Sequence, residues 1–156
     1  MFQRDQWLCH VCRRPVVFHL TLKYLEIEAR VGLGDSSITY WHPNWRRDQA
    51  PLADELGACV DHVMAFSTGG AHDVDNFKTI CSRCNSRKSA KTLPQFIEEL
   101  RPWHVSGKYG EPEQWDGLSS TFIHLARKHA ALLSPPEREW LSELENRRST
   151  RQGGTR

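Results

Sequence analysis

The chain has 156 residues, of which 38% are hydrophobic and 26% are charged, and its formal net charge at pH 7 is +2. This length fits one compact domain with a modest core and excludes a second large domain. The small net charge excludes overall basicity as a sign of nucleic-acid binding, so any such sign must come from local clusters of charge. No apolar run approaches the roughly 20 residues of a membrane span, and we expect a cytoplasmic protein with no membrane partner.

The chain contains two Cys-x-x-Cys pairs, the first at Cys9 and Cys12 and the second at Cys81 and Cys84. Because we expect no secretory signal, such pairs favour metal binding over disulfides. Four thiolates suit a tetrahedral structural Zn²⁺, which we therefore expect as a cofactor. The alternative is that the four cysteines are reduced thiols in the core. We expect the remaining cysteine, Cys59, to be a small buried hydrophobic residue.

The secondary structure at the start of the segment between the pairs is ambiguous. Apolar residues are dense over residues 16–30 but fit neither the helical nor the strand period, so both structures remain open. Residues 36–40 are typical of a short strand. Residues 40–47 interleave aromatic and basic side chains, which is compatible with a loop that contacts nucleic acid. We favour the alternative, in which the aromatic rings pack against the zinc site and the arginines are solvated.

A hairpin and a helix are expected in the middle of the chain. We predict strands over residues 58–64 and 77–80, a turn at Gly69 and Gly70, and a helix over residues 84–91. Another helix should begin after Thr92, with Gln95 completing a capping box. We expect that helix to bury Phe96, Ile97 and Leu100.

The last third of the chain predicts a linker and two helices. Residues 101–118 are rich in Pro and Gly. A helical apolar stripe covers residues 120–133, and a second helix should open with a capping box formed by Ser134 and Glu137. We expect these helices to bury Phe122, Ile123, Leu125, Ala126, Ala130, Leu133, Trp140, Leu141 and Leu144.

One short window gathers residues with metal-binding and catalytic chemistry. It contains the pair Asp61 and His62, the Gly-Gly turn, Asn76, and Asn85 directly after the second Cys-x-x-Cys pair. This pattern resembles the signature of the HNH endonuclease family, in its His-Asn-Asn variant. The resemblance implies an α+β fold, a ββα-metal core stapled by the four-cysteine zinc site and followed by C-terminal helices. The Pro that often follows the Asp-His pair is missing, which leaves the path of the loop open.

The resemblance also implies roles for these residues. His62 would be the general base, and Asn76 would fix the loop that orients it. Asp61 and Asn85 would bind the catalytic Mg²⁺ or Mn²⁺, while Lys88 and Arg87 would contact the nucleic acid. The chemistry agrees, because carboxylate and amide oxygens are hard ligands and an imidazole titrates near neutral pH. His72 and Asp73 are additional candidates near this site.

These expectations define a division of the chain and a function. Residues 1–100 would form the HNH nuclease domain with its zinc knuckles, 101–118 a linker, 119–148 a helical appendage, and 149–156 a disordered basic tail. We expect an endonuclease that hydrolyses DNA by a one-metal mechanism, with RNA as a further possible substrate. The alternative is a non-catalytic, zinc-stabilised module for nucleic-acid binding or assembly. A restriction or phage role and the oligomeric state stay open.

Overall fold

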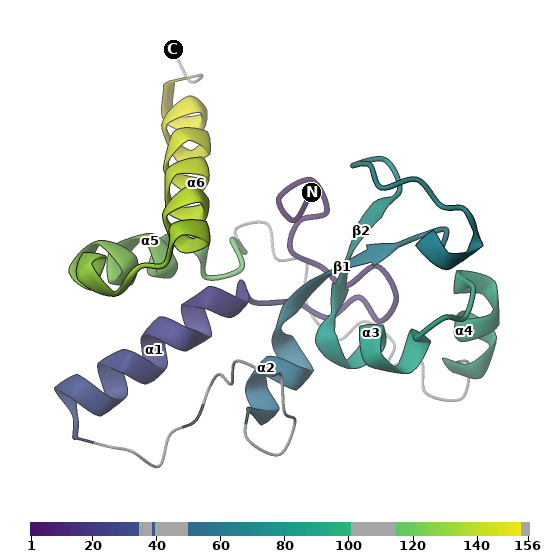
Figure 1. Cartoon of the computed structure of the whole chain (residues 1–156), viewed down its shortest axis with the longest axis horizontal. Coiled ribbons are helices and arrows are strands. Elements are labelled where there is room, and N and C mark those ends of the chain that lie inside the picture. Colours follow the sequence, from purple (N-terminus) through teal and green to yellow (C-terminus); the bar gives the residue numbers. More distant parts are fainter. Residues whose placement is uncertain (35–38, 40–49, 101–114, 154–156) are drawn as a thin grey trace.

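The computed structural model describes residues 1–34, 39, 50–100 and 115–153 of the chain. Figure 1 shows a mixed α+β fold in which a β-hairpin is combined with helices. The described elements, in chain order, are α1 (His19–Gly32), α2 (Pro51–Leu56), β1 (Ala58–His62), η1 (Phe66–Thr68), β2 (Phe77–Cys81), α3 (Ser82–Lys88), α4 (Leu93–Leu100), α5 (Ser119–Lys128), η3 (Ala130–Leu132) and α6 (Pro135–Gly153).

The hairpin and the helix after it confirm the predicted ββα arrangement. β1 and β2 are antiparallel, with Asp61 opposite Lys78 and His62 opposite Phe77. α3 follows β2 directly and packs against both strands. It begins at Ser82, earlier than predicted, because the Cys81 sulfur accepts a hydrogen bond from the Cys84 amide at 3.4 Å and so caps the first turn.

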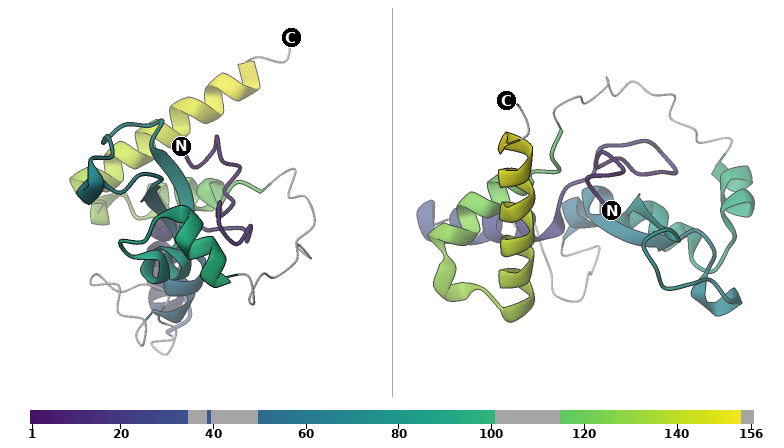
Figure 2. Two further views of the ribbon diagram at one scale, coloured as in Figure 1. Left: turned by 90° about the vertical axis from the view of Figure 1, so that its right-hand side faces the viewer. Right: turned by 90° about the horizontal axis from the view of Figure 1, so that it is seen from above.

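The segment that the sequence left open is helical. α1 buries Leu20, Leu22 and Tyr24 and packs against α5, and Figure 2 shows α1, α5 and α6 gathered at the end of the molecule away from α4. Immediately before α1, the ring of Phe18 contacts Phe122 of α5 edge to face, with centroids 5.1 Å apart. One hydrophobic cluster contains Phe18, Tyr24 and Phe122 together with Ile80 of β2, so the helices and the hairpin share a core.

Residues 115–118 pack against the N-terminal segment. The indole of Trp115 donates a hydrogen bond to the Val16 carbonyl at 2.9 Å, and the Phe18 amide donates to the Gly117 carbonyl at 2.8 Å. The rest of the predicted linker, 101–114, lies outside the described residues. The predicted aromatic and basic loop at 40–47 and most of the predicted strand at 36–40 also lie outside them. The division into domains therefore stays a prediction.

One half of each predicted capping box is present in α4 and α6, namely the bond from the N-cap amide to the side chain three residues later. The Gln95 side chain accepts a hydrogen bond from the Thr92 amide at 2.9 Å, and Glu137 accepts one from the Ser134 amide at 2.8 Å. Other details were wrong. The predicted helix over 120–133 ends at Lys128, because the backbone of His129 leaves the helical region. α6 continues to Gly153, so residues 149–153 are helical where we predicted a disordered tail.

Some side chains are more exposed than the apolar stripes predicted. Ile97 is 42% exposed and Trp140 is 37% exposed, and Ala130 is exposed as well. Phe96, at 1% exposure, is buried in the core, and Leu93 of the same helix packs against that core. Within the described part of the chain, no helix combines the length and the apolar character that crossing a membrane requires.

The contact between Gly117 and Trp7 gives a test of this packing. Gly117 has φ +66°, and a Cβ there would lie 2.3 Å from the Trp7 ring, whereas Gly34 has φ +65° and a Cβ there would meet no atom of the described residues within 4 Å. Gly34→Ala should lower the free energy of unfolding by about 1 kcal/mol through backbone strain alone. Gly117→Ala should cost roughly 2 kcal/mol more, because the buried ring must move. Denaturant titration measures both variants, and equal losses would contradict the described packing.

Candidate functional site

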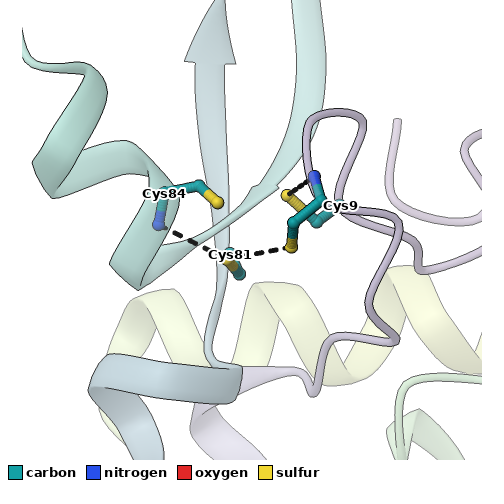
Figure 3. A group of neighbouring side chains, drawn as sticks. Cys9, Cys81 and Cys84 are labelled. Atoms are coloured by element: carbon teal, nitrogen blue, oxygen red, sulfur yellow. Dashed lines mark hydrogen bonds between the residues drawn. The ribbon is translucent and has the colours of Figure 1, made fainter. Parts of the chain in front are cut away.

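The four cysteines of the two pairs converge on one point. Their sulfur atoms all lie within 4.8 Å of one another, and the sulfurs of Cys12 and Cys81 are 3.9 Å apart. Figure 3 shows Cys81 and Cys84, at the junction of β2 and α3, facing the N-terminal loop that carries Cys9. In a tetrahedral site with zinc–sulfur bonds of about 2.3 Å, the sulfurs are separated by about 3.8 Å. The cluster is therefore compatible with structural zinc.

The electrostatics of the cluster also fit a bound cation. Hydrogen bonds from Cys12, Cys81 and Cys84 place the pKa of Cys9 far below its ordinary value. Contacts with Cys12, Cys84 and Cys9 raise the pKa of Cys81 instead. The opposite directions arise because crowded thiols stabilise one negative charge and oppose the next. Zn²⁺ would allow all four sulfurs to be thiolates.

Cys59 is separate from this cluster. It lies on β1, is partly buried and packs against the hydrophobic core. Burial raises the pKa of its thiol, which disfavours the thiolate that a metal needs. This placement is close to the small hydrophobic role that we expected, and Cys59 provides a matched control for the four clustered cysteines.

Asp61 lies in the interior of the site with both carboxylate oxygens engaged. The residue is 4% exposed. Its Oδ1 accepts a hydrogen bond from the Lys88 ammonium at 2.8 Å, and its Oδ2 lies 3.0 Å from Nε2 of His10. Burial alone would raise the pKa of this carboxyl, but the bonds from His10 and Lys88 outweigh burial and lower it. Asp61 is therefore an anion at neutral pH.

Lys88 does not lie where the sequence predicted. It is 2% exposed, and its ammonium donates to Asp61 and, at 3.3 Å, to the carbonyl of His62. We expected Lys88 to contact a flanking phosphate, which a buried ammonium cannot reach in this conformation. The correction has a simple cause, since the buried carboxylate needs a counter-charge and α3 offers this lysine. Arg87, in the same last turn, is exposed.

His62 lies at the end of β1 and is only partly buried. Its ring packs edge to face against Phe77, with centroids 4.8 Å apart, and approaches Phe66. Its Nε2 is 3.2 Å from Nδ1 of His72, an exposed residue of the following loop. Asp61 points inward while His62 remains accessible, as alternation along a strand requires.

Asn76 fixes the loop between the strands. Its Oδ1 accepts a hydrogen bond from the Met64 amide at 2.9 Å, and its Nδ2 donates to the carbonyls of Met64 and Ala71 at 3.0 and 2.7 Å. The Asp73 side chain accepts a hydrogen bond from the Asn76 amide at 2.9 Å, so it also takes part in this loop. Gly70 is required at the turn, since a Cβ there would lie 1.9 Å from the Met64 carbonyl.

Asn85 lies on α3 one turn before Lys88 and is partly buried. Residues three apart share a helix face, and Lys88 contacts Asp61, so Asn85 belongs to the face of α3 that meets β1. Its side chain forms no hydrogen bond within the described part of the chain. Asp61 and Asn85 together offer the oxygen ligands that Mg²⁺ and Mn²⁺ prefer. A cation at Asp61 would compete with the Lys88 ammonium.

Sequence reasoning missed two contacts of this site. His10 was assigned no role, yet its imidazole reaches Asp61. The available signal was its position between Cys9 and Cys12, on a loop that a shared zinc site must bring to β2. The second contact is the pairing of Lys88 with Asp61, which no local pattern indicates.

The comparison with known protein families agrees with this arrangement. Residues 53–101 match the family model described as HNH endonuclease. The matched segment runs from α2 to the end of α4, and so includes the hairpin, Asp61, His62, Asn76 and Asn85. Neither the curated proteins nor the solved structures give a significant match.

The four-cysteine cluster predicts that substituting a cysteine within it removes zinc, while substituting a cysteine outside it does not. Cys81→Ser should remove the stoichiometric zinc and lower stability, because zinc binding and folding are coupled at such sites. Cys59→Ser should retain zinc, since Cys59 is outside the cluster. Metal content per chain and the melting temperature measure both effects. A Cys81→Ser protein that keeps its zinc and its melting temperature would refute the assignment.

The buried ion pair predicts a pH-dependent loss of stability. Lys88→Met should lower the free energy of unfolding by about 3 kcal/mol at neutral pH, because Asp61 is left with a poorly compensated charge. The low pKa of Asp61 means that its favourable contribution exists above the unfolded pKa of about 4 and is lost as the pH falls through the folded value. The deficit of the variant should therefore shrink toward low pH.

Lys91→Met is the control for this prediction, because Lys91 forms an exposed ion pair with Glu99. Exposed pairs contribute little, so this variant should stay within about 0.5 kcal/mol of wild type. Urea titrations between neutral and acidic pH measure both variants. Equal stability of the two at neutral pH would contradict the described pairing of Lys88 and Asp61.

Proposed function

We propose that this chain, whose residues 53–101 match the family model described as HNH endonuclease, hydrolyses phosphodiester bonds of DNA with the help of Mg²⁺ or Mn²⁺. One observation carries the proposal. The inward carboxylate of Asp61 and the accessible imidazole of His62 end the same strand, beside the helix that presents Asn85. An anionic metal ligand and a general base are thus adjacent, which is the requirement for metal-assisted hydrolysis.

In this proposal His62 removes a proton from the attacking water. Its imidazole is partly exposed at the end of β1, and a ring nitrogen can accept a proton from a water that lies within hydrogen-bond reach. Phe77 and Phe66 contact its ring and limit its orientations. Asn76 holds the following loop through three hydrogen bonds to the main chain, which keeps His62 and His72 in place.

Asp61 and Asn85 would hold the divalent cation. When bound, the metal would supply positive charge to the phosphate and the leaving oxygen. The hydrogen bonds from His10 and Lys88 hold the pKa of Asp61 below its ordinary value, so its carboxylate is ionised and can bind a cation. Arg87, exposed on the last turn of α3, supports binding of a neighbouring phosphate.

A second function is favoured by one observation. Lys88 and His10 already engage one oxygen each of Asp61, and the buried ammonium of Lys88 supplies the positive charge that a metal would otherwise provide. The same fold would then be a zinc-stabilised module that binds nucleic acid without cutting it. The two functions differ in whether Mg²⁺ or Mn²⁺ produces cleavage.

Cleavage of supercoiled plasmid by the zinc-loaded protein tests the proposal. Mg²⁺ or Mn²⁺ should produce nicked or linear DNA, and His62→Ala should slow the reaction at least about 100-fold because the general base is lost. His124→Ala is the matched control, since His124 is an exposed histidine on α5 and should cut like wild type. A matched RNA substrate determines whether the activity extends to RNA.

Two results would contradict the proposal. Cutting by His62→Ala at the wild-type rate would remove the assigned base. Metal-independent binding of DNA by wild type, with no cleavage in either metal, would favour the non-catalytic module.

A further inference from the structure

We infer that His10 is a positioning residue for Asp61, and that it links the four-cysteine cluster to the metal-binding carboxylate. This inference rests on the proposed function of the same site. His10 is outside the segment that matches the HNH family, which begins at residue 53. Its role therefore comes from the contacts of this chain.

The contact between the two residues is direct and sheltered. His10 Nε2 lies 3.0 Å from Asp61 Oδ2, and the two side chains are 14% and 5% exposed. The main chain of the same residue is also fixed, because its amide donates to the Thr79 carbonyl of β2 at 2.8 Å. The imidazole is therefore anchored to the hairpin at its backbone while its ring contacts the opposite strand.

Together with Lys88, His10 provides each oxygen of the Asp61 carboxylate with a hydrogen-bond donor. Lys88 reaches Oδ1 from α3, and His10 reaches Oδ2 from the N-terminal loop. A single ammonium on a flexible side chain leaves the carboxylate free to rotate about its terminal bond. A second donor, on a ring with few rotamers, fixes the direction in which the carboxylate lone pairs point.

The cysteine cluster holds the loop that carries this ring. Cys9 and Cys12 flank His10, and their sulfurs gather with those of Cys81 and Cys84. Loss of zinc would free the loop and remove one of the two partners of Asp61. The structural metal thus contributes to the orientation of a catalytic-metal ligand as well as to stability.

Mn²⁺ binding to the zinc-loaded protein, measured by electron paramagnetic resonance, tests the inference without relying on cleavage. His10→Ala should raise the dissociation constant for Mn²⁺ roughly 10-fold or more, the usual effect of removing a partner that orients a metal ligand. His10→Gln retains a donor near the same position and should recover most of the affinity. Arg13→Ala, an exposed position of the same loop, should bind like wild type.

Zinc content and melting temperature must be measured in parallel, because a purely structural role would change them first. Weaker Mn²⁺ binding by His10→Ala at full zinc content, with rescue by His10→Gln, supports the inference. An unchanged dissociation constant at full zinc content overturns it, as does wild-type protein that binds no Mn²⁺. His10-dependent Mn²⁺ binding without DNA cleavage would reject the proposed nuclease activity and retain the positioning role.

Discussion

The described site depends on one buried negative charge. Asp61 is almost fully removed from solvent, and a carboxylate in that position is costly unless charged or hydrogen-bonding groups surround it. Its two partners come from different parts of the chain, Lys88 from α3 and His10 from the N-terminal loop. Satisfying this charge therefore requires β1, α3 and the loop to meet at one place, which is also where His62 is presented.

The four cysteines make that meeting possible in a very small sheet. A two-stranded hairpin is at best marginally stable by itself. Here the cysteine cluster joins the hairpin to the start of α3, which carries Cys84, and to the N-terminal loop, which carries Cys9 and Cys12. All four cysteines, Cys81 included, contact the hydrophobic core. The same core includes Phe18, which directly precedes α1, and Phe122 of α5. Packing of these two helices therefore also stabilises the hairpin that carries the site.

The sequence predicted those features that local chemistry determines. Cysteine spacing identified the four members of the cluster, and the Asp-His, Asn and Asn-after-Cys pattern identified a segment that the HNH family model also matches. The partners of Asp61 were missed because alternation in a strand shows which side chains point inward but not what they meet there. We expected Lys88 to contact nucleic acid, and only the packing of α3 against β1 reveals its burial. The exposure of Trp140 was missed for a similar reason. An apolar stripe shows which face of a helix turns toward the core, but it does not show how much of that face the core covers.

The most direct test is whether Asp61 and Asn85 bind a divalent cation beside the zinc site. It requires a crystal structure of the zinc-loaded protein soaked in Mn²⁺, with anomalous scattering recorded at the absorption edges of both metals. The account predicts a zinc peak among the four cysteine sulfurs and a manganese peak ligated by Asp61 and Asn85, with the Lys88 ammonium moved off the carboxylate and His10 still on it. A zinc peak alone, with Lys88 still bonded to Asp61 at high Mn²⁺ concentration, would contradict it.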